Sequence, residues 1–231
     1  MILPALVSHQ LKIPLIHLGG GEITKNSPDN NYRKIISKLS TYHFCSSLYA
    51  KKRLNKLGVK KNIKIVGVTS FEELSKFDFS ENKKILKRYN LIKNEFVLFS
   101  YHSETIDLQK EKKLIDFTLK RLLKLNYKII ITSSNNDFNG RALNDYLKNI
   151  RNHHIIFINS IGSEFYKYFL FNCKFMIGNS SSGITESVFF KKLNISIGDR
   201  QIGRDHDKNT FFLRYNFKKI QLFLSNIENK I

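Results

Sequence analysis

Three consecutive serines follow an apolar stretch that ends in Gly178, and the pattern behind them predicts a helix. Serine hydroxyls and backbone N–H groups at the start of a helix favour anions, phosphate above all. The predicted phosphate contacts are Ser180, Ser181, Ser182 and Gly183. Glu186, one turn further on, is a candidate ligand for ribose hydroxyls. The alternatives are a serine N-cap without a ligand and a first-turn acid that only complements the helix dipole.

A glycine-rich segment, HLGGGE, ends in Glu22, and Asp29 follows seven residues later. Glycines allow the backbone to approach a ligand closely. Two carboxylates near one ligand suit proton abstraction from carbon, with one group as base and the other as acid. Arg33 lies one turn behind Asp29 in a predicted helix. For Asp29 the alternative is a helix N-cap.

His102 directly follows a predicted strand, where a histidine can donate to a phosphate or to a leaving-group oxygen near neutral pH. A purely structural histidine is the alternative. The segment GDRQIGR also follows a predicted strand and supplies Arg200 and Arg204, which we expect close to the serine turn. Arginine grips phosphate with two hydrogen bonds, although either residue could instead form an ordinary salt bridge.

Short apolar runs alternate with longer segments of helical period along the chain. The predicted strands span 13–17, 42–45, 63–67, 96–101, 128–132, 154–158, 175–178 and 195–198. The predicted helices span 32–39, 47–57, 108–125, 141–150, 164–172, 184–191 and 217–227. Continuously apolar strands that alternate with helices indicate an α/β fold with parallel sheets. We expect a partial N-terminal domain at 1–67, a polar linker or crossover at 68–94, and a complete βα series at 95–231.

The composition of the 231-residue chain limits the possible partners. Its formal net charge is +20, but the lysines are spread along the whole chain, which favours a solvated basic surface over nucleic acid. No apolar run approaches the ~20 residues that span a bilayer, and the N-terminus lacks the features of a secretory signal. We therefore expect a cytoplasmic protein without a membrane partner. The two cysteines, Cys45 and Cys173, support neither a disulfide framework nor a zinc site.

Taken in order, these segments resemble the UDP-N-acetylglucosamine 2-epimerase family. The likeness is specifically to its hydrolysing branch, which serves the synthesis of sialic or legionaminic acid-type sugars. The motifs that carry the resemblance are IPLIHLGGGEIT, GNSSSGITE and GDRQIGR. Three positions depart from the family pattern. Asn30 stands where the family has a second Asp, Lys34 where it has His, and Ser103 where it has Pro.

The resemblance implies a glycosyltransferase-B-like architecture, in which two Rossmann-like domains with parallel sheets bind a UDP-sugar between them. It also implies a reaction: loss of the C2 proton with elimination of UDP, then addition of water to give the free C2-epimer, N-acetylmannosamine or a relative. The implied catalytic residues are Glu22, Asp29 and His102. The implied UDP-sugar ligands are Ser180, Ser181, Ser182, Gly183, Glu186, Arg200 and Arg33. No metal and no cofactor are implied.

The family extends further on the N-terminal side, so the resemblance implies a truncated chain whose first domain is incomplete. We expect such a chain to form a homo-oligomer or to bind a complementing N-terminal fragment, and to have little activity alone. Two alternatives remain open at this point. One is a UDP-sugar glycosyltransferase of the same fold, and the other is an inactive remnant or accessory subunit.

Overall fold

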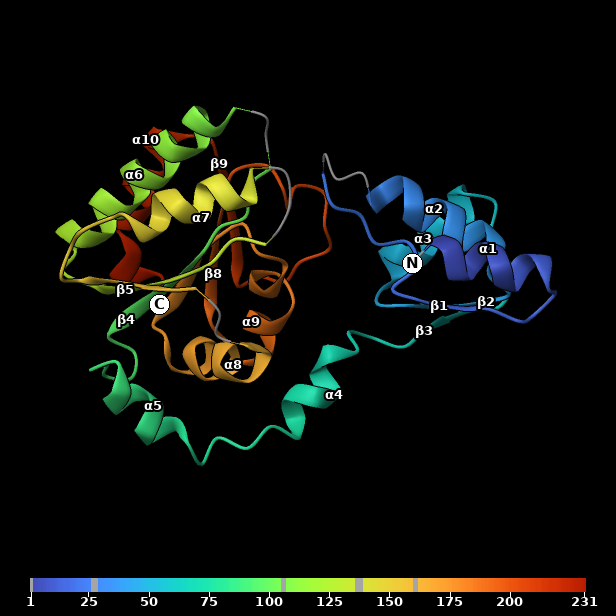
Figure 1. Cartoon of the computed structure of the whole chain (residues 1–231), viewed down its shortest axis with the longest axis horizontal. Helices are drawn as coiled ribbons and strands as arrows, with labels where there is room; N and C mark the ends of the chain where they lie inside the picture. Colours follow the sequence, from blue (N-terminus) through green and yellow to red (C-terminus); the bar gives the residue numbers. More distant parts are fainter. Residues whose placement is uncertain (1, 26–28, 105–106, 136–138, 160–161) are drawn as a thin grey trace. The chain divides into compact units, whose positions relative to one another are not determined.

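The computed structural model describes residues 2–25, 29–104, 107–135, 139–159 and 162–231. The chain forms two compact units (Figure 1). The first unit consists of Met1–Glu73 and Ile202–Asp205, and the second consists of Leu74–Gln201 and His206–Ile231. The expected linker at 68–94 therefore divides between the units near its start. The four residues 202–205, expected in the C-terminal domain, belong to the first unit.

The first unit contains a parallel three-stranded sheet with the order β1-β2-β3. Its elements are α1 (Ile2–Gln10), β1 (Ile16–Leu18), α2 (Asp29–Leu39), β2 (Tyr42–Cys45), α3 (Leu48–Lys56) and β3 (Ile63–Ile65). His17 pairs with His43 across the sheet, and both side chains are buried. The neighbouring pair, Ile16 and Tyr42, points to the other face, where both side chains are exposed. One face of this sheet is thus covered and the other is open.

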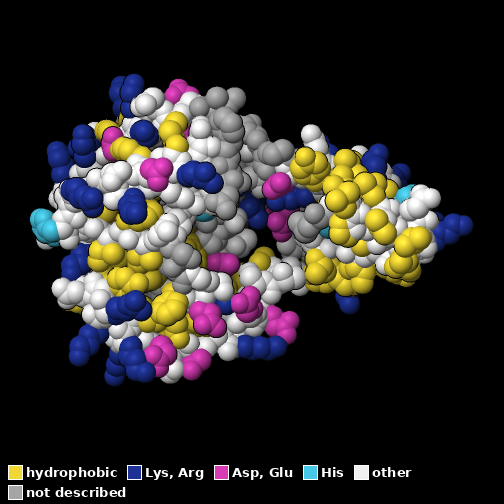
Figure 2. Space-filling model, in the orientation of Figure 1, with side chains coloured by type: hydrophobic (Ala, Val, Ile, Leu, Met, Phe, Trp, Pro, Cys, Tyr) yellow, Lys and Arg dark blue, Asp and Glu magenta, His cyan; other side chains and the backbone are white. Residues whose placement is uncertain are grey.

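Large apolar side chains are exposed over much of the first unit. Figure 2 shows them gathered in yellow over this part of the chain. We define the apolar surface of the first unit by its exposed members Leu3, Leu6, Val7, Leu11, Ile13, Ile16, Leu18, Tyr32, Ile35 and Tyr42. Soluble monomers rarely expose contiguous apolar patches larger than a few hundred Å². Exposed apolar side chains of this size and number can mark a contact surface.

The second unit contains a six-stranded parallel sheet with the order β6-β5-β4-β7-β8-β9. The strands are β4 (Phe96–Ser100), β5 (Lys128–Thr132), β6 (Ile155–Ile158), β7 (Phe175–Gly178), β8 (Leu193–Ile197) and β9 (Thr210–Arg214). The helices are α4 (Ser70–Ser75), which begins in the first unit, α5 (Asn82–Arg88), α6 (Leu108–Lys124), α7 (Gly140–Lys148), α8 (Gly162–Asn172), α9 (Glu186–Phe189) and α10 (Phe217–Ser225), with 3₁₀ turns at Ser181–Gly183 and Ile227–Asn229. The chain leaves β4 in one direction along the sheet and returns at β7 on its other side. Ligands of open α/β sheets bind at such a switch in strand order.

Alternate residues of β4 show how helices cover both faces of the larger sheet. Val97 and Phe99 belong to a core that includes Leu114 of α6. Phe96 and Leu98 belong to a second core on the opposite face, formed with α5 and α8. Burial on both faces explains why the strands are apolar without interruption, and it confirms the expected α/β class with parallel sheets.

Several features differ from the sequence-based expectation, among them helices α1 and α4, which no predicted helix covers. Strand β9 (Thr210–Arg214) was not expected; it lies at the edge of the sheet, where Phe211 and Arg214 are exposed. The helix predicted at 184–191 is reduced to Glu186–Phe189, preceded by a 3₁₀ turn. The segment from Leu74 onward contributes helix α5 and the buried Leu91 to the second unit. In the described part of the chain, no helix has the length and apolarity needed to cross a bilayer.

Candidate functional site

In the second unit, three loops at the carboxyl edge of the sheet are joined by buried amides. The main chain of His102 donates to Asn179 Oδ1 at 2.7 Å and accepts from Asn179 Nδ2 at 2.8 Å. Gln201 Nε2 donates to the Asn179 carbonyl at 2.7 Å. Asn179 and Gln201 are each 1% exposed. These hydrogen bonds therefore hold the loops after β4, β7 and β8 together at the switch in strand order.

The imidazole of His102 has a defined tautomer. Its Nδ1 accepts from the N–H of Asn135 at 3.1 Å. In the neutral ring, the hydrogen-bond pattern therefore assigns the proton to Nε2. A ring held in this way can donate from Nε2 to a ligand oxygen.

Two glutamates, which the sequence analysis did not single out, also form hydrogen bonds at the carboxyl ends of the strands. Glu111 is fully buried and accepts from the Ser103 hydroxyl at 2.8 Å and from the N–H of Glu104 at 2.7 Å. The Glu104 carboxylate accepts from the N–H of Asp199 at 2.8 Å, and burial raises its pKa. Arg200 Nη1 donates to the Ser103 carbonyl at 3.2 Å. These contacts link the loop after β4 to the arginine loop after β8.

The serine turn is more tightly built than its sequence suggests. Ser182 is buried, where its hydroxyl contacts the Ser180 hydroxyl at 2.9 Å and the Tyr166 hydroxyl. A Cβ at Gly183 would overlap the side chain of Asn194, so this position requires glycine. Ser181 is the exposed serine of the three. A 3₁₀ turn followed by a four-residue helix supplies a much weaker dipole than the predicted helix, so hydroxyl and backbone donors remain as the means of binding an anion here.

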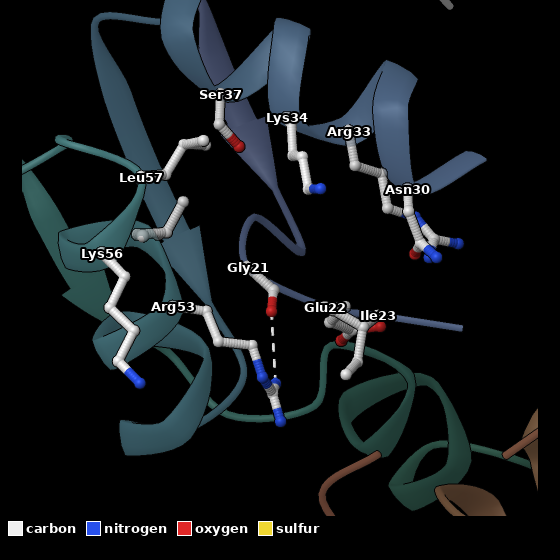
Figure 3. A pocket seen from close by; sticks show the side chains of 11 residues that line it. Gly21, Glu22, Ile23, Asn30, Arg33, Lys34, Ser37, Arg53, Lys56 and Leu57 are labelled. Carbon is white, nitrogen blue, oxygen red and sulfur yellow. Dashed lines mark hydrogen bonds between the residues drawn. The ribbon is translucent and has the colours of Figure 1, made fainter. Parts of the chain in front are cut away.

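The first unit holds a pocket of about 320 Å³ between α2, α3 and the glycine turn (Figure 3). It is lined by Gly21, Glu22, Ile23, Asn30, Arg33, Lys34, Ser37, Arg53, Leu54, Lys56 and Leu57. Glu22 forms an ion pair with Arg204 at 3.0 Å. Arg53 donates to the Gly21 carbonyl at 3.2 Å and forms an ion pair with Asp205 at 2.6 Å. Segment 202–205 thus holds two of the side chains that line this pocket, Glu22 and Arg53.

The predicted acid Asp29 opens α2, and its side chain is 61% exposed, 3.8 Å from Arg33. Arg33 also donates to the Thr24 hydroxyl at 3.2 Å. Asn30 accepts from the Thr24 N–H at 3.0 Å and donates to its carbonyl at 2.6 Å. An ionised aspartate at this position would have no donor for the Thr24 carbonyl, which gives a physical reason for the amide. The structure thus brings Glu22 and Arg33 to one pocket, with Asp29 beside Arg33.

A buried histidine beneath the glycine turn was not singled out from the sequence. His17 Nδ1 lies 3.0 Å from the Ser37 hydroxyl. Burial, with smaller contributions from the positive charges of His43 and Arg33, lowers the pKa of His17 to about 4. The ring is therefore neutral at physiological pH. Its position in HLGGGE was the available signal.

The two arginines of GDRQIGR lie in different units and contact different partners. Arg200 lies in the second unit, hydrogen-bonded to the loop after β4. Arg204 belongs to the first unit and pairs with Glu22. The proximity of Arg204 to the serine turn therefore stays a prediction, because Arg204 and the serine turn belong to different units. Among the residues that the structure describes, no cluster of His, Cys, Asp or Glu could hold a metal ion.

An open parallel sheet with a strand-order switch between β4 and β7 defines the second unit as Rossmann-like, and the chain as an α/β protein of the glycosyltransferase-B type. A family profile described as UDP-N-acetylglucosamine 2-epimerase matches residues 1–230. The chain belongs to this family.

Two curated relatives and one solved structure show how far the similarity extends. A GDP/UDP-N,N'-diacetylbacillosamine 2-epimerase (hydrolyzing) from Campylobacter jejuni is 38% identical over 90% of this chain and 56% of its own length. A UDP-N,N'-diacetylbacillosamine 2-epimerase (hydrolyzing) from Legionella pneumophila is 28% identical over 100% of this chain and 62% of its own length. The chain thus spans little more than half of these relatives. The UDP-GlcNAc 2-epimerase of Methanocaldococcus jannaschii, solved with UDP-GlcNAc and UDP, has a TM-score of 0.81 at 22% identity. That match covers 100% of this chain and 66% of that structure.

Proposed function

We propose that the protein acts in the hydrolysing 2-epimerisation of a UDP-linked 2-acetamido sugar. One observation carries the proposal: hydrogen bonds of Asn179 and Gln201 hold the loops after β4, β7 and β8 together at the switch in strand order. In open α/β sheets this position binds nucleotides. Family membership supports the same reaction.

In the proposed reaction, a carboxylate removes the C2 proton and the C1–O bond breaks, so that its electron pair leaves with UDP and a glycal forms. Water then adds its oxygen to C1, and a proton reaches C2 from the opposite face. We assign the proton transfers to Glu22 and Asp29. Arg204 holds the carboxylate of Glu22 in place through an ion pair at 3.0 Å. Arg33 would bind the substrate beside them.

The second unit would hold the leaving group. Ser180, Ser181, Ser182 and Gly183 form the proposed phosphate contacts, with Ser181 the most accessible serine. Glu186 would accept from the ribose hydroxyls. His102 donates from Nε2 and Arg200 from its guanidinium as charge develops on the departing diphosphate. Donors fixed before the reaction stabilise this charge without the cost of reorganisation.

We propose a 2,4-diacetamido sugar as the preferred substrate, because the Campylobacter and Legionella relatives are both named for N,N'-diacetylbacillosamine. A product of the N-acetylmannosamine type, used for sialic acid synthesis, is the corresponding result if the substrate is UDP-N-acetylglucosamine. A competition assay with the two UDP-sugars distinguishes them by the ratio of kcat/KM.

The apolar surface of the first unit supports a partner proposal. We propose that further polypeptide of the same family fold covers it, since the relatives are longer than the matched region. The test is size-exclusion chromatography of the chain alone and with the N-terminal region of the Campylobacter relative. Formation of a 1:1 complex supports the proposal, whereas a stable homodimer that excludes the added region contradicts it.

Calorimetry with UDP tests the binding site. Ser181→Ala and Glu186→Ala should each weaken UDP affinity by about 10- to 100-fold, as expected when a charged hydrogen bond is lost. Lys148→Gln, on the surface of α7, is the matched control. Unchanged affinity in both site variants would refute the assignment.

Turnover in D₂O tests the chemistry, with the chain alone and with the added N-terminal region. UDP release should accompany deuterium incorporation at C2 of the free sugar. Glu22→Gln and Asp29→Asn should each lower kcat by about 10²-fold or more with little change in KM. UDP release without deuterium at C2 would contradict the elimination mechanism.

A further inference from the structure

A second pocket, of about 560 Å³, lies at the opposite edge of the larger sheet from the serine turn. Its lining includes Lys174, which directly precedes β7, and Lys192, which directly precedes β8. Asn209, directly before β9, also contributes. These positions mark the amino ends of the strands. The pocket is therefore separate from the loops that hold His102 and the serines.

Five lysines line this pocket, which we call the lysine pocket: Lys174, Lys191, Lys192, Lys208 and Lys230. The negative groups nearby are few. Glu228 pairs with Lys174 at 2.6 Å, and Asp207 accepts from the main-chain N–H of Lys208 at 2.6 Å. In the described part of the chain, no carboxylate pairs with the exposed ammonium groups of Lys191 and Lys208. The pocket thus carries an excess of positive charge.

Two of the ammonium groups, those of Lys192 and Lys174, are partly shielded from water. Lys192 is partly buried and donates to Asn94 Oδ1 at 2.8 Å. Burial, with a smaller contribution from Lys93, lowers its pKa. The side chain of Lys174 is 23% exposed, and its ammonium group forms the ion pair with Glu228. Gathering ammonium groups in a hollow of reduced hydration costs free energy, and a bound anion would offset that cost.

We propose that the lysine pocket binds a linear chain of phosphate groups, as an inorganic oligophosphate or as the phosphates of a nucleoside triphosphate. Lysine binds phosphate as a compact point charge, and several lysines around one hollow match an anion with several charges. The volume lies within the usual ~300–1,000 Å³ of small-ligand pockets. This site does not depend on the proposed epimerase activity.

The test is calorimetry of the full chain with inorganic tripolyphosphate, with UDP present to occupy the site at the serine turn. The variant Lys191→Asn/Lys208→Gln removes two exposed charges; Asn suits position 191, where φ is 52°. The control variant, Lys120→Gln/Lys148→Gln, removes two exposed charges from α6 and α7 of the same unit. Affinity should fall about tenfold or more in the pocket variant and by less than about twofold in the control.

Three results would overturn the proposal: no saturable binding, equal loss in the pocket and control variants, or displacement of tripolyphosphate by UDP. A parallel titration with UTP distinguishes the two sources. Equal affinities for UTP and tripolyphosphate identify the phosphate chain alone as the ligand. A UTP affinity at least tenfold higher, and equally sensitive to the pocket variant, identifies a nucleoside triphosphate.

Discussion

The buried imidazole of His17 should make the first unit sensitive to mild acid. Its pKa is about 4 in the folded protein, against about 6.5 for an exposed histidine in the unfolded chain. Between these values the unfolded state binds more protons than the folded state. The free energy of unfolding therefore falls as the pH drops from 6.5 towards 4, and this effect is absent above the unfolded pKa.

The size of the effect follows from the two pKa values. A difference of about 2.5 units corresponds to about 3 kcal/mol when the pH is below both values. At pH 5, where the unfolded histidine is mostly charged and the folded one mostly neutral, the expected loss is about 2 kcal/mol relative to pH 7. His43, whose pKa is also lowered by burial, acts in the same direction. Such a loss is a large fraction of the stability of an ordinary domain.

The measurement is urea denaturation at pH 7 and pH 5, followed by circular dichroism, for the natural chain and for His17→Gln. Glutamine can still form a hydrogen bond with Ser37 but does not titrate, so the variant should lose less stability at pH 5 by about 2 kcal/mol. An NMR titration of the His17 ring gives its pKa directly. An identical pH dependence in both proteins, or a His17 pKa near 6.5, would refute the reasoning.

Two further substitutions probe the framework of the second unit. Glu111→Ala removes the acceptor for the Ser103 hydroxyl and for the Glu104 N–H. The free energy of unfolding, measured by urea denaturation, should therefore fall by about 2–5 kcal/mol. Glu111→Gln should restore part of the lost stability. Gly178→Ala places a Cβ on the Ser100 carbonyl at a φ of +146°, so UDP affinity should weaken, whereas Gly162→Ala, where the Cβ meets open space, should leave UDP affinity unchanged. Normal UDP affinity in Gly178→Ala would show that the turn after β7 does not contribute to binding.

The sequence predicts the larger sheet well because its strands are buried on both faces. The runs FVLFS and KIIIT are apolar throughout, and they form β4 and β5. Strand β9 was missed because its apolar run is only three residues long, from Phe211 to Leu213, and lies between polar segments. Helix α9 is shorter than its local pattern predicts, and the hydroxyl of Ser187, fully buried within it, bonds to the Gly183 carbonyl. The same hydroxyl accepts from Asn209 Nδ2 at 2.9 Å, and local periodicity carries no information on such a tertiary contact.

For the candidate site, the residue types indicated which segments form it. They did not indicate which residues hold the loops in place and which can contact a ligand. The sequence points equally to every residue of GNSSSG and GDRQIGR. In the structure, Asn179 and Gln201 are buried and use their amides to hold neighbouring loops, so their side chains cannot also reach a ligand. Ser181 is exposed, and Arg200 is partly exposed. Arg204, four residues beyond Arg200, pairs instead with Glu22 in the other unit. Each motif thus combines groups that hold the framework with groups that can touch a ligand, and only the hydrogen-bond geometry separates them.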